Sequence, residues 1–309
     1  MKYLVTGGAG FIGSHLVDRL IKEGHKVVVI DNLSTGKKEN LNPKAKFYKI
    51  DIGSSKIYQI FRKEKFEIVF HYAAQISVRK SIKNSLEDAK INILGSLNVL
   101  ENCKKFGVKK VIFPSTGAVY GDAKVLPTPE DYPELPLSPY AISKLTIEKY
   151  LNYYYKNFNL LFLSLRLANV YGPRQNPQGE AGVIAIFLKK MLSKGQPIIY
   201  GDGMQTRDFI FIDDVVEANI LALKSNKVGI FNIGTSKETN VKTIFKKLKE
   251  LTASKCTEVH VPALPCEQKR SCLDYSKAKK ILGWRPKYNL NEGLTITMKW
   301  FRENSDIYF

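Results

Sequence analysis

The feature that most constrains this chain is a glycine-rich turn near its amino terminus, in the stretch VTGGAGFIG of residues 5–13. Residues 2–5 predict a short buried strand, and residues 11–23 repeat apolar side chains at helical spacing. A turn without side chains between strand and helix exposes backbone amides and the positive end of the helix dipole to a pyrophosphate. Glycines also mark ordinary turns, so the glycines alone are weak evidence. The strand before them and the helix after them make a dinucleotide-binding site the better interpretation. The predicted cofactor contacts in this turn are Gly7, Gly10, Phe11, Ile12 and Gly13.

The second predicted strand, residues 26–30, leads into Asp31, which comes 18 residues after Gly13. A carboxylate at this spacing can accept hydrogen bonds from the ribose hydroxyls of adenosine and would repel a 2′-phosphate. The sequence therefore favours NAD over NADP. The alternative, an aspartate that caps a helix or a turn, fits this spacing less well.

Three further strands are predicted over residues 47–50, 68–70 and 110–113. The first leads into Asp51-Ile52, where the edge of an adenine would lie. The second leads into HYAA, in which small residues let the backbone pack against a cofactor. The predicted cofactor contacts here are Asp51, Ile52, Tyr72, Ala73 and Ala74, whereas we expect His71 to be structural.

The strand over residues 110–113 runs into Ser115 and Thr116. Hydroxyls at the carboxyl end of a strand in an open α/β sheet lie where ligands bind. A long helix is predicted from about Ser85 to Lys105, and Asn92 within it either orients catalytic groups or belongs to a solvated face. Ser115 and Asn92 are predicted cofactor contacts.

A further helix is predicted from about Pro139, consistent with proline in a first helical turn. It carries Tyr140 and Lys144, which share one helix face because they are four residues apart. A nearby ammonium favours the phenolate and is expected to lower the pKa of the tyrosine toward working pH. The pattern alone is weak evidence, but it becomes specific after a glycine-rich turn and a Ser-Thr strand end.

Composition limits the other functions that the chain can have. Its 309 residues carry 48 Lys and Arg against 29 Asp and Glu, a net charge of +19. The lysines are spread along the chain without a nucleic-acid-binding signature, so we expect no nucleic-acid partner. No apolar run of about 18 residues predicts a membrane span, and the start MKYLVTGG leads directly into a strand, so we expect a cytoplasmic protein. Cys256, His260, Cys266 and Cys272 lack the paired spacing of a zinc site, and we expect no metal.

Taken together, these motifs resemble those of the extended short-chain dehydrogenase/reductase family, and within it the nucleotide-sugar 4-epimerases. TGGAGFIGSHL, DNLSTGK, HYAA, STGAVYG, SPYAISK, RLANVYGPR, YGDGMQTRDFIFIDDVV and SKAKKILGW match family segments in order, over essentially the whole chain. The resemblance implies a doubly wound, mostly parallel Rossmann sheet that holds NAD and a smaller α/β domain for the nucleotide sugar. We assign residues 1–171 and 208–234 to the first domain and residues 172–207 and 235–309 to the second. In DNLSTGK the further cofactor contacts are Asn32, Ser34, Thr35 and Gly36.

The resemblance also implies the chemistry. Tyr140 would remove the proton of the sugar 4-hydroxyl while hydride passes from C4 to the nicotinamide, and Thr116 would hydrogen-bond the same oxygen. Lys144 would hold the nicotinamide ribose and tune Tyr140. Dehydratases and decarboxylases of the family carry acidic residues just after this threonine, whereas Gly117 and Ala118 follow here. This difference favours simple epimerisation.

The resemblance assigns residues to the nucleotide sugar one by one. Asn169 and Arg207 would contact the diphosphate, Val183 and Tyr200 would flank the base, and Glu267 would bind the ribose. For Arg207 the alternative is a surface salt bridge with Asp208. The predicted substrate contacts are Ser77, Thr116, Tyr140, Asn169, Val183, Tyr200, Arg207, Glu267, Arg270 and Ser271.

One segment departs from the family pattern. Leu264 replaces a second diphosphate-binding arginine, and we expect Arg270 to substitute for it. The small Ser271 falls where relatives have a residue that gates the sugar pocket, which predicts space for an N-acetyl group. Residues 85–105 and 140–158 are rich in apolar and aromatic side chains, and relatives dimerise through these helices, so we expect a homodimer.

The sequence thus predicts an NAD-dependent 4-epimerase of a UDP-hexose, either UDP-glucose and UDP-galactose or also their N-acetylated forms. Alternatives are a UDP-glucuronate epimerase or a dTDP-glucose 4,6-dehydratase. A non-catalytic RNA-binding relative is a third, which the intact Thr116, Tyr140 and Lys144 set disfavours.

Overall fold

The computed structural model describes residues 1–178, 182–263 and 268–309, and its backbone contacts divide the chain into two compact units. The first unit consists of Met1–Val119, Pro136–Arg166 and Val216–Phe231. The second unit consists of Tyr120–Leu135, Leu167–Val215 and Asn232–Phe309. These units are defined by contacts alone, so the domain boundaries that the resemblance implies stay a prediction.

A seven-stranded sheet with the strand order β10-β6-β5-β4-β1-β2-β3 organises the first unit. In that order the strands are Gly229–Ile233, Leu161–Leu167, Lys110–Thr116, Ile68–His71, Lys2–Thr6, Lys26–Asp31 and Lys46–Lys49. Strand β1 pairs in parallel with β2 and with β4, and β2–β3 and β4–β5 are parallel as well. The strand order reverses at β1, which is where ligands bind in open α/β sheets, at the carboxyl ends of the strands. The sheet confirms the predicted Rossmann fold.

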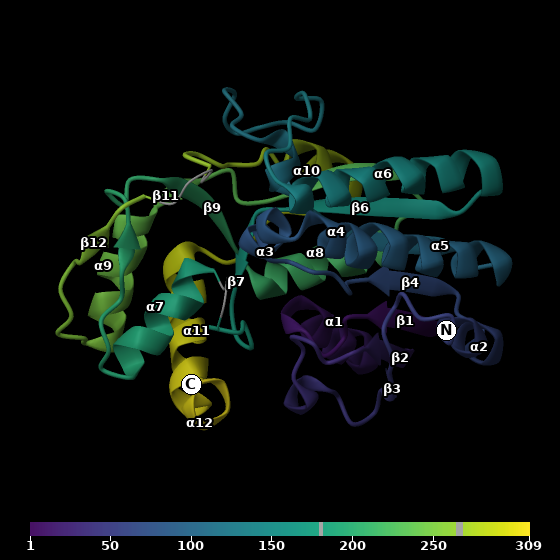
Figure 1. Ribbon diagram of the computed structural model, residues 1–309, viewed down its shortest axis with the longest axis horizontal. Coiled ribbons are helices and arrows are strands. Elements are labelled where there is room, and N and C mark those ends of the chain that lie inside the picture. Colours follow the sequence, from purple (N-terminus) through teal and green to yellow (C-terminus); the bar gives the residue numbers. More distant parts are fainter. Residues whose placement is uncertain (179–181, 264–267) are drawn as a thin grey trace. The chain divides into compact units, whose positions relative to one another are not determined.

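The first unit contains the following helices, wholly or, for α8, in large part. They are α1 Phe11–Lys22, α2 Ile57–Glu64, α3 Val78–Lys83, α4 Ser85–Ala89, α5 Gly95–Lys105, α6 Pro139–Phe158 and α8 Ile212–Lys224. The helix predicted over residues 85–105 is present but has a π-helical turn, η2 Lys90–Leu94, between α4 and α5. Helices α4 and α5 pack beside α6 (Figure 1). Single-turn 3₁₀ segments occur at η1 Lys38–Asn40 and η3 Gly117–Tyr120.

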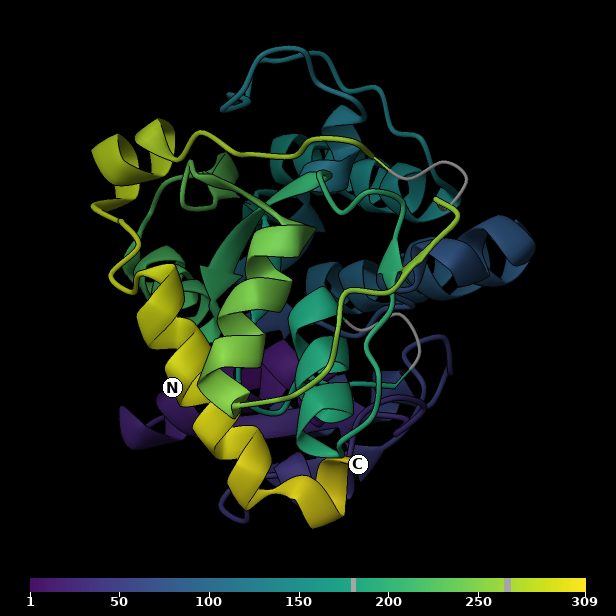
Figure 2. The same cartoon turned by 90° about the vertical axis from the view of Figure 1, so that its left-hand side faces the viewer.

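The second unit has two small sheets and its own helices. The strands are β7 Asn169–Tyr171, β9 Thr206–Phe211 and β11 Glu238–Asn240 in one sheet, and β8 Ile199–Tyr200 and β12 His260–Val261 in the other. The helices are α7 Val183–Leu192, α9 Val241–Thr252, α10 Ser276–Leu282, α11 Leu290–Glu303 and α12 Ser305–Tyr308. Helices α7, α9 and α11 pack side by side (Figure 2). Their apolar faces meet, as where the rings of Phe187 and Phe245 pack edge to face at 5.8 Å.

Local signals explain where several helices begin. At α11 the side chain of Asn289 accepts a hydrogen bond from the amide of Glu292, and the Glu292 carboxylate accepts one from the amide of Asn289. This capping box satisfies amides that a helix start leaves without partners. None of the described helices is both long enough and apolar enough to cross a membrane.

Candidate active site

The glycine turn brings three backbone segments too close together for side chains. Gly7 has φ +70°, and a Cβ on it would lie 2.6 Å from the amide nitrogen of Ala73. A Cβ on Gly13 would lie 2.2 Å from the carbonyl oxygen of Gly7. Gly10 precedes α1, and no side chain of a described residue caps the amides of the first turn. These amides, with the helix dipole, are suited to bind phosphate oxygens.

Asp31 lies at the end of β2, beside the glycine turn. Its buried carboxylate accepts hydrogen bonds from the amides of Ala9 at 3.0 Å and Leu33 at 2.8 Å. A carboxylate has about four lone-pair sites, so two remain for ligand hydroxyls. The predicted role of Asp31 toward a ribose is compatible with this geometry and stays a prediction.

The residues after β2 and β3 are joined by polar contacts. The side-chain amide of Asn32 donates to the carboxylate of Asp51 at 2.7 Å, and the backbone of Gly36 packs against Ala9. Ser34 and Thr35 are exposed, whereas Ile52 is buried. The structure therefore gathers this group of predicted cofactor contacts at one edge of the sheet.

The end of β4 is tied into the interior through His71. Its ring nitrogens lie 2.7 Å from Oγ1 of Thr6 and 2.8 Å from Oγ of Ser96. Burial, with a smaller effect of the Lys144 charge, lowers the pKa of His71 to about 3. The imidazole is therefore neutral and structural, as predicted.

The HYAA residues that follow His71 are also fixed. The hydroxyl of Tyr72 donates to Asn219 at 2.8 Å, and the amide of Ala73 donates to Thr6 Oγ1 at 3.1 Å. Ala74 follows and is half-buried. The backbone that was predicted to face the cofactor is thus held by side chains of β1 and α8.

Strand β5 continues to Thr116, three residues beyond its predicted end. Ser115 is buried, and its hydroxyl has no hydrogen-bond partner among the described residues. A buried hydroxyl without a partner costs about 1–3 kcal/mol, so a polar ligand atom here would be stabilised. Thr116 Oγ1 accepts a hydrogen bond from the amide of Ala118 at 3.2 Å and also hydrogen-bonds the phenol of Tyr140.

Helix α6 positions the tyrosine and the lysine. Ser138 caps the helix by accepting a hydrogen bond from the amide of Ala141, and Pro139 occupies the first position. One turn after Tyr140, the ammonium of Lys144 donates to the carbonyl oxygen of Pro114 at 2.9 Å. Its Nζ lies 5.9 Å from the centroid of the Tyr140 ring. The predicted set of Thr116, Tyr140 and Lys144 is therefore brought together.

The pKa of Tyr140 differs from the one predicted from the sequence. Burial and the negative charge of Asp88 raise the pKa of Tyr140 to about 12, although the hydrogen bond from Thr116 lowers it. Burial also lowers the pKa of Lys144 to about 8. The expectation that Lys144 lowers the pKa of Tyr140 is therefore wrong for the protein chain itself, because removal from water dominates.

Two other predicted residues lie on the helices next to α6. Ser77 caps α3 by accepting a hydrogen bond from the amide of Lys80 at 2.9 Å. Asn92 lies in the π-helical turn and is 2% exposed, so the alternative of a solvated face is wrong. Its side-chain oxygen accepts a hydrogen bond from the amide of Gln75 at 2.8 Å.

In the second unit, four predicted substrate residues lie on or beside the sheet β11-β9-β7. Asn169 begins β7, in register with Phe209 of β9. Arg207 lies on β9, and the amide of Ser271 donates to the carbonyl oxygen of Thr206 at 3.2 Å. Arg270 is bound to Glu238 of β11 through two hydrogen bonds, that from Nε at 2.9 Å.

The alternative role of Arg207 is also wrong. Asp208 is fully buried and accepts hydrogen bonds from the amides of Thr235, Ser236 and Leu273. It cannot form a surface salt bridge. Neighbouring residues of a strand point to opposite faces, which separates the two side chains.

The remaining predicted substrate residues lie on other elements of the second unit or outside the described residues. Val183 begins α7, and Tyr200 lies on β8 with its carbonyl oxygen bound by the side-chain amide of Gln205 at 2.9 Å. Glu267, Leu264 and Cys266 lie outside the described residues.

Comparison with known proteins now identifies the family. A profile of the NAD dependent epimerase/dehydratase family matches residues 3–234. The chain belongs to this family.

The most similar members of this epimerase/dehydratase family include a crystal structure of UDP-glucose 4-epimerase with UDP-glucose from Thermotoga maritima. It is 50% identical, covers 99% of this chain and 100% of its own, and has a TM-score of 0.97. A Thermus thermophilus UDP-glucose 4-epimerase in complex with NAD is 40% identical, covers 98% of this chain and 99% of its own, and has a TM-score of 0.93. A UDP-glucose 4-epimerase of Mycolicibacterium smegmatis is 43% identical over 99% of this chain and all of its own.

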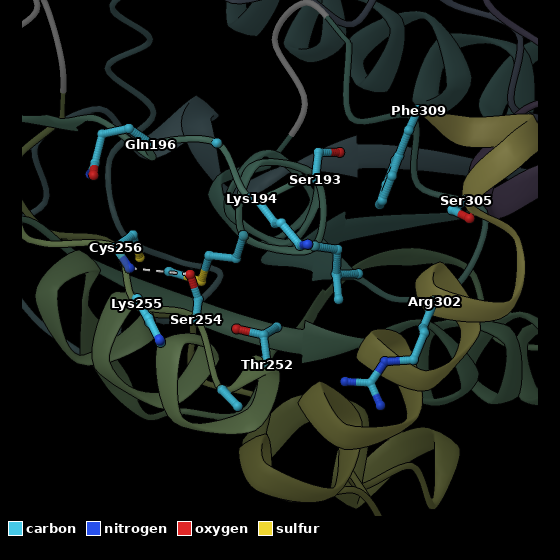
Figure 3. Close-up of a pocket in the computed structure, with 14 residues that line it drawn as sticks. Ser193, Lys194, Gln196, Thr252, Ser254, Lys255, Cys256, Arg302, Ser305 and Phe309 are labelled. Atoms are coloured by element: carbon cyan, nitrogen blue, oxygen red, sulfur yellow. Dashed lines mark hydrogen bonds between the residues drawn. The ribbon is translucent and has the colours of Figure 1, made fainter.

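This family member also has a hollow in its second unit, where α7, α9 and α11 end (Figure 3). Its volume is about 990 Å³, and its walls include the basic side chains of Lys194, Lys255 and Arg302. Cations at helix carboxyl ends offset the negative end of the dipole. None of the predicted site residues that the structure describes lines this hollow. Among the residues that the structure describes, no cluster of His, Cys, Asp or Glu could hold a metal.

The structure shows two contacts of site residues that the sequence did not predict. Asp88 contacts Asn92. In the sequence this contact is indicated only by the spacing of four residues, which places the two side chains on one face of a helix. Glu238 binds Arg270 from a separate strand, and no local pattern connects the two residues.

Proposed function

We propose that this chain is an NAD-dependent UDP-hexose 4-epimerase. The observation that carries the proposal is the juxtaposition of Tyr140, Lys144 and Thr116 in the first unit, beside the sheet edge where the glycine turn lies. The resemblance to solved UDP-glucose 4-epimerases over nearly the whole chain supports the choice of reaction.

The residues fit NAD in two ways. The turn around Gly7 and Gly13 leaves space only for backbone, and the buried hydroxyl of Ser115 has no partner among the described residues. Asp31 keeps lone pairs for the adenosine ribose and would repel a 2′-phosphate. Bound NAD would supply a reversible hydride acceptor next to the sugar carbon.

In the proposed mechanism the protein moves one proton. The phenolate of Tyr140 takes it from the sugar 4-hydroxyl, and Thr116 donates a hydrogen bond to the same oxygen. Lys144 holds the nicotinamide ribose, and the hydrogen bond from Thr116 favours the phenolate. After the 4-keto sugar has presented its other face, Tyr140 returns the proton to the oxygen. The absence of an acidic side chain at Gly117 and Ala118 disfavours a dehydratase, which needs an additional acid and base.

For the nucleotide we propose that Arg207 and Asn169 bind the diphosphate, a role that suits the planar donors of arginine. Val183 and Tyr200 flank the base, Glu267 binds the ribose, and Ser77 contacts the sugar. Arg270 supplements Arg207 in place of the arginine that Leu264 replaces. The small Ser271 leaves space for an N-acetyl group, so UDP-N-acetylhexosamines are also substrates. Turnover of UDP-galactose without turnover of UDP-N-acetylgalactosamine would contradict this last assignment.

We further propose a homodimer in the cytoplasm. Helices α4 to α6 expose large apolar side chains, among them Leu86 at 82%, Leu94 at 61% and Tyr153 at 50%. Exposed apolar faces of this kind mark association surfaces. Light scattering should give twice the chain mass, and Leu94→Arg should give monomers; a wild-type monomer would contradict the dimer. For the cytoplasm, the free thiols of Cys103, Cys256 and Cys272 suit a reducing compartment.

The experiment that tests the function is product analysis with a panel of UDP- and dTDP-sugars. A C4 epimer formed without loss of water or carbon dioxide is the expected product. Release of NAD from the denatured protein can be measured in the same sample. Loss of water would favour the dehydratase, and a C4 epimer of UDP-glucuronate alone would favour the uronic-acid epimerase.

A further inference from the structure

A carboxylate that forms no direct ion pair with a described residue is buried beside the proposed catalytic helix. Asp88, on α4, is 1% exposed, and its Oδ1 accepts hydrogen bonds from the amide groups of Gln75 at 2.9 Å and Asn92 at 3.0 Å. Both donors are neutral, and no lysine or arginine in residues 1–178, 182–263 and 268–309 forms an ion pair with it. Burial of a charge without a direct ion pair is costly, so Asp88 requires an explanation beyond packing.

A chain of hydrogen bonds connects Asp88 to α6. The side-chain amide of Asn92 also donates to the carbonyl oxygen of Gln75 at 2.9 Å and to Oγ of Ser143 at 3.3 Å. Ser143 in turn donates to the carbonyl oxygen of Tyr140 at 2.9 Å. Because α4 packs against α6 (Figure 1), the carboxylate is fixed relative to the turn that carries Tyr140 and Lys144.

The charged groups around this turn are few. From α6 itself Glu148 faces Lys144, but its carboxylate is bound to Arg166 of β6, with Nη2 to Oε2 at 2.6 Å. From β4, His71 is neutral because burial lowers its pKa. From α4, Asp88 raises the pKa values of both Tyr140 and Lys144. The charge of Asp88 is thus the one that no described arginine or lysine side chain neutralises by direct contact.

We propose that Asp88 is a positioning residue whose carboxylate, held by Gln75 and Asn92, is the buried counter-charge of the Lys144 ammonium. It keeps Lys144 charged and sets the pH range in which Tyr140 exchanges its proton. The functional part of this inference rests on the proposed epimerase activity, whereas the electrostatic part concerns the protein alone.

The variant that isolates the charge is Asp88→Asn, because its side-chain oxygen can still accept both hydrogen bonds. Removal of a negative charge lowers the pKa values of both groups. Both limbs of the pH profile of kcat should therefore move to lower pH, by about one pH unit, with the KM for the UDP-sugar changed less than about twofold. Glu87→Gln, which removes an exposed carboxylate from the same helix, is the matched control and should leave the profile unchanged.

A second measurement separates this inference from the proposed function. In protein labelled with ¹³C at Cζ of tyrosine, the NMR signal that disappears in Tyr140→Phe reports ionisation of Tyr140 without any substrate. Asp88→Asn should lower the pH at which this signal shifts, and Glu87→Gln should not. If wild-type protein epimerises no UDP-sugar but the NMR shift occurs, the proposed function fails and the electrostatic assignment stands.

Two results would overturn the proposal. One is an Asp88→Asn protein that is folded and whose pH profile and NMR titration match those of the wild type. The other is failure of both neutral variants, Asp88→Asn and Asp88→Ser, to fold while Asp88→Glu folds, because the carboxylate would then serve stability. The double substitution of Asp88→Asn and Asn92→Asp places the negative charge one helical turn away. It should reverse at least half of the pH shift that Asp88→Asn causes alone.

Discussion

The two units position their candidate functional residues by different means. In the first unit most of these residues follow a strand or begin a helix, and buried hydrogen bonds hold them, as at Thr6, His71 and Asp31. In the second unit Arg270 is 60% exposed on its side chain and is held by an ion pair with Glu238. Backbone-defined sites tolerate little change, whereas long exposed side chains can exchange one anion for another. Substitutions should therefore have larger effects in the first unit.

The largest effect is expected for Tyr140→Phe, which removes the proposed base. Because a positioned acid–base group contributes about 10²–10⁴-fold, kcat should fall by about 10³-fold. The amount of NAD released from the denatured protein should stay the same, since the phenol is not needed to hold the dinucleotide. Turnover equal to that of the wild type would show that another group is the base.

Substitutions in the glycine turn should have nearly as large an effect, and the effect should depend on how closely the added Cβ approaches the backbone. A Cβ on Gly13 would lie 2.2 Å from the Gly7 oxygen, whereas one on Gly10 would lie 3.2 Å from it. Gly13→Ala should therefore lose most of the copurifying NAD and about 1–3 kcal/mol of unfolding free energy, and Gly10→Ala much less of both. The measurements are NAD per chain and urea unfolding. Equal effects of the two substitutions would contradict the view that backbone contact controls this turn.

A smaller effect is expected for the arginines of the second unit. Loss of a hydrogen-bonded charge at Arg207 should raise the KM for a UDP-sugar by about 10–100-fold with little change in kcat. Arg270→Ala should raise it by less than about tenfold, because Arg270 must leave Glu238 to bind phosphate. Steady-state kinetics decide between them, and a larger effect at Arg270 would reverse the assigned roles.

The smallest effect concerns stability at the edge of the first unit. Burial raises the pKa of Glu64, but hydrogen bonds from Lys46, Tyr48 and Lys2 outweigh it and lower the pKa to about 2. The pKa is depressed in the folded state, so this stability is present above the unfolded value of about 4.3 and is lost as pH falls toward 2. Glu64→Gln should cost about 1–2 kcal/mol at pH 7, discounted for the exposed lysines, and almost nothing near pH 2. Urea titrations at both pH values measure this difference, and a cost independent of pH would rule out the charge as its source.

Much of the first unit could be predicted because its signals are local. The strand–glycine turn–helix, Asp31 and the pair of Tyr140 and Lys144 are each recognisable within a few residues. The start of α11 at Leu290 is likewise defined by a local feature, because Asn289 and Glu292 form a capping box.

What could not be predicted depends on contacts between distant segments. The pKa of Tyr140 is raised by burial and by Asp88, which lies 52 residues away in the sequence. The burial of Asp208 depends on the amides of Thr235 and Leu273, and the pairing of Arg270 depends on Glu238 across two strands. Periodicity and motif spacing carry no information on such contacts.

The central claim is that Tyr140 and a bound nicotinamide oxidise C4 of a UDP-hexose and reduce it again within one site. It is tested most directly by incubating the purified protein with UDP-galactose in D₂O and recording the ¹H NMR spectrum of the products. The account predicts UDP-glucose with ordinary hydrogen at C4, because the hydride returns from the cofactor and does not exchange with solvent. Deuterium at C4, or no UDP-glucose from a protein that contains NAD, would contradict it.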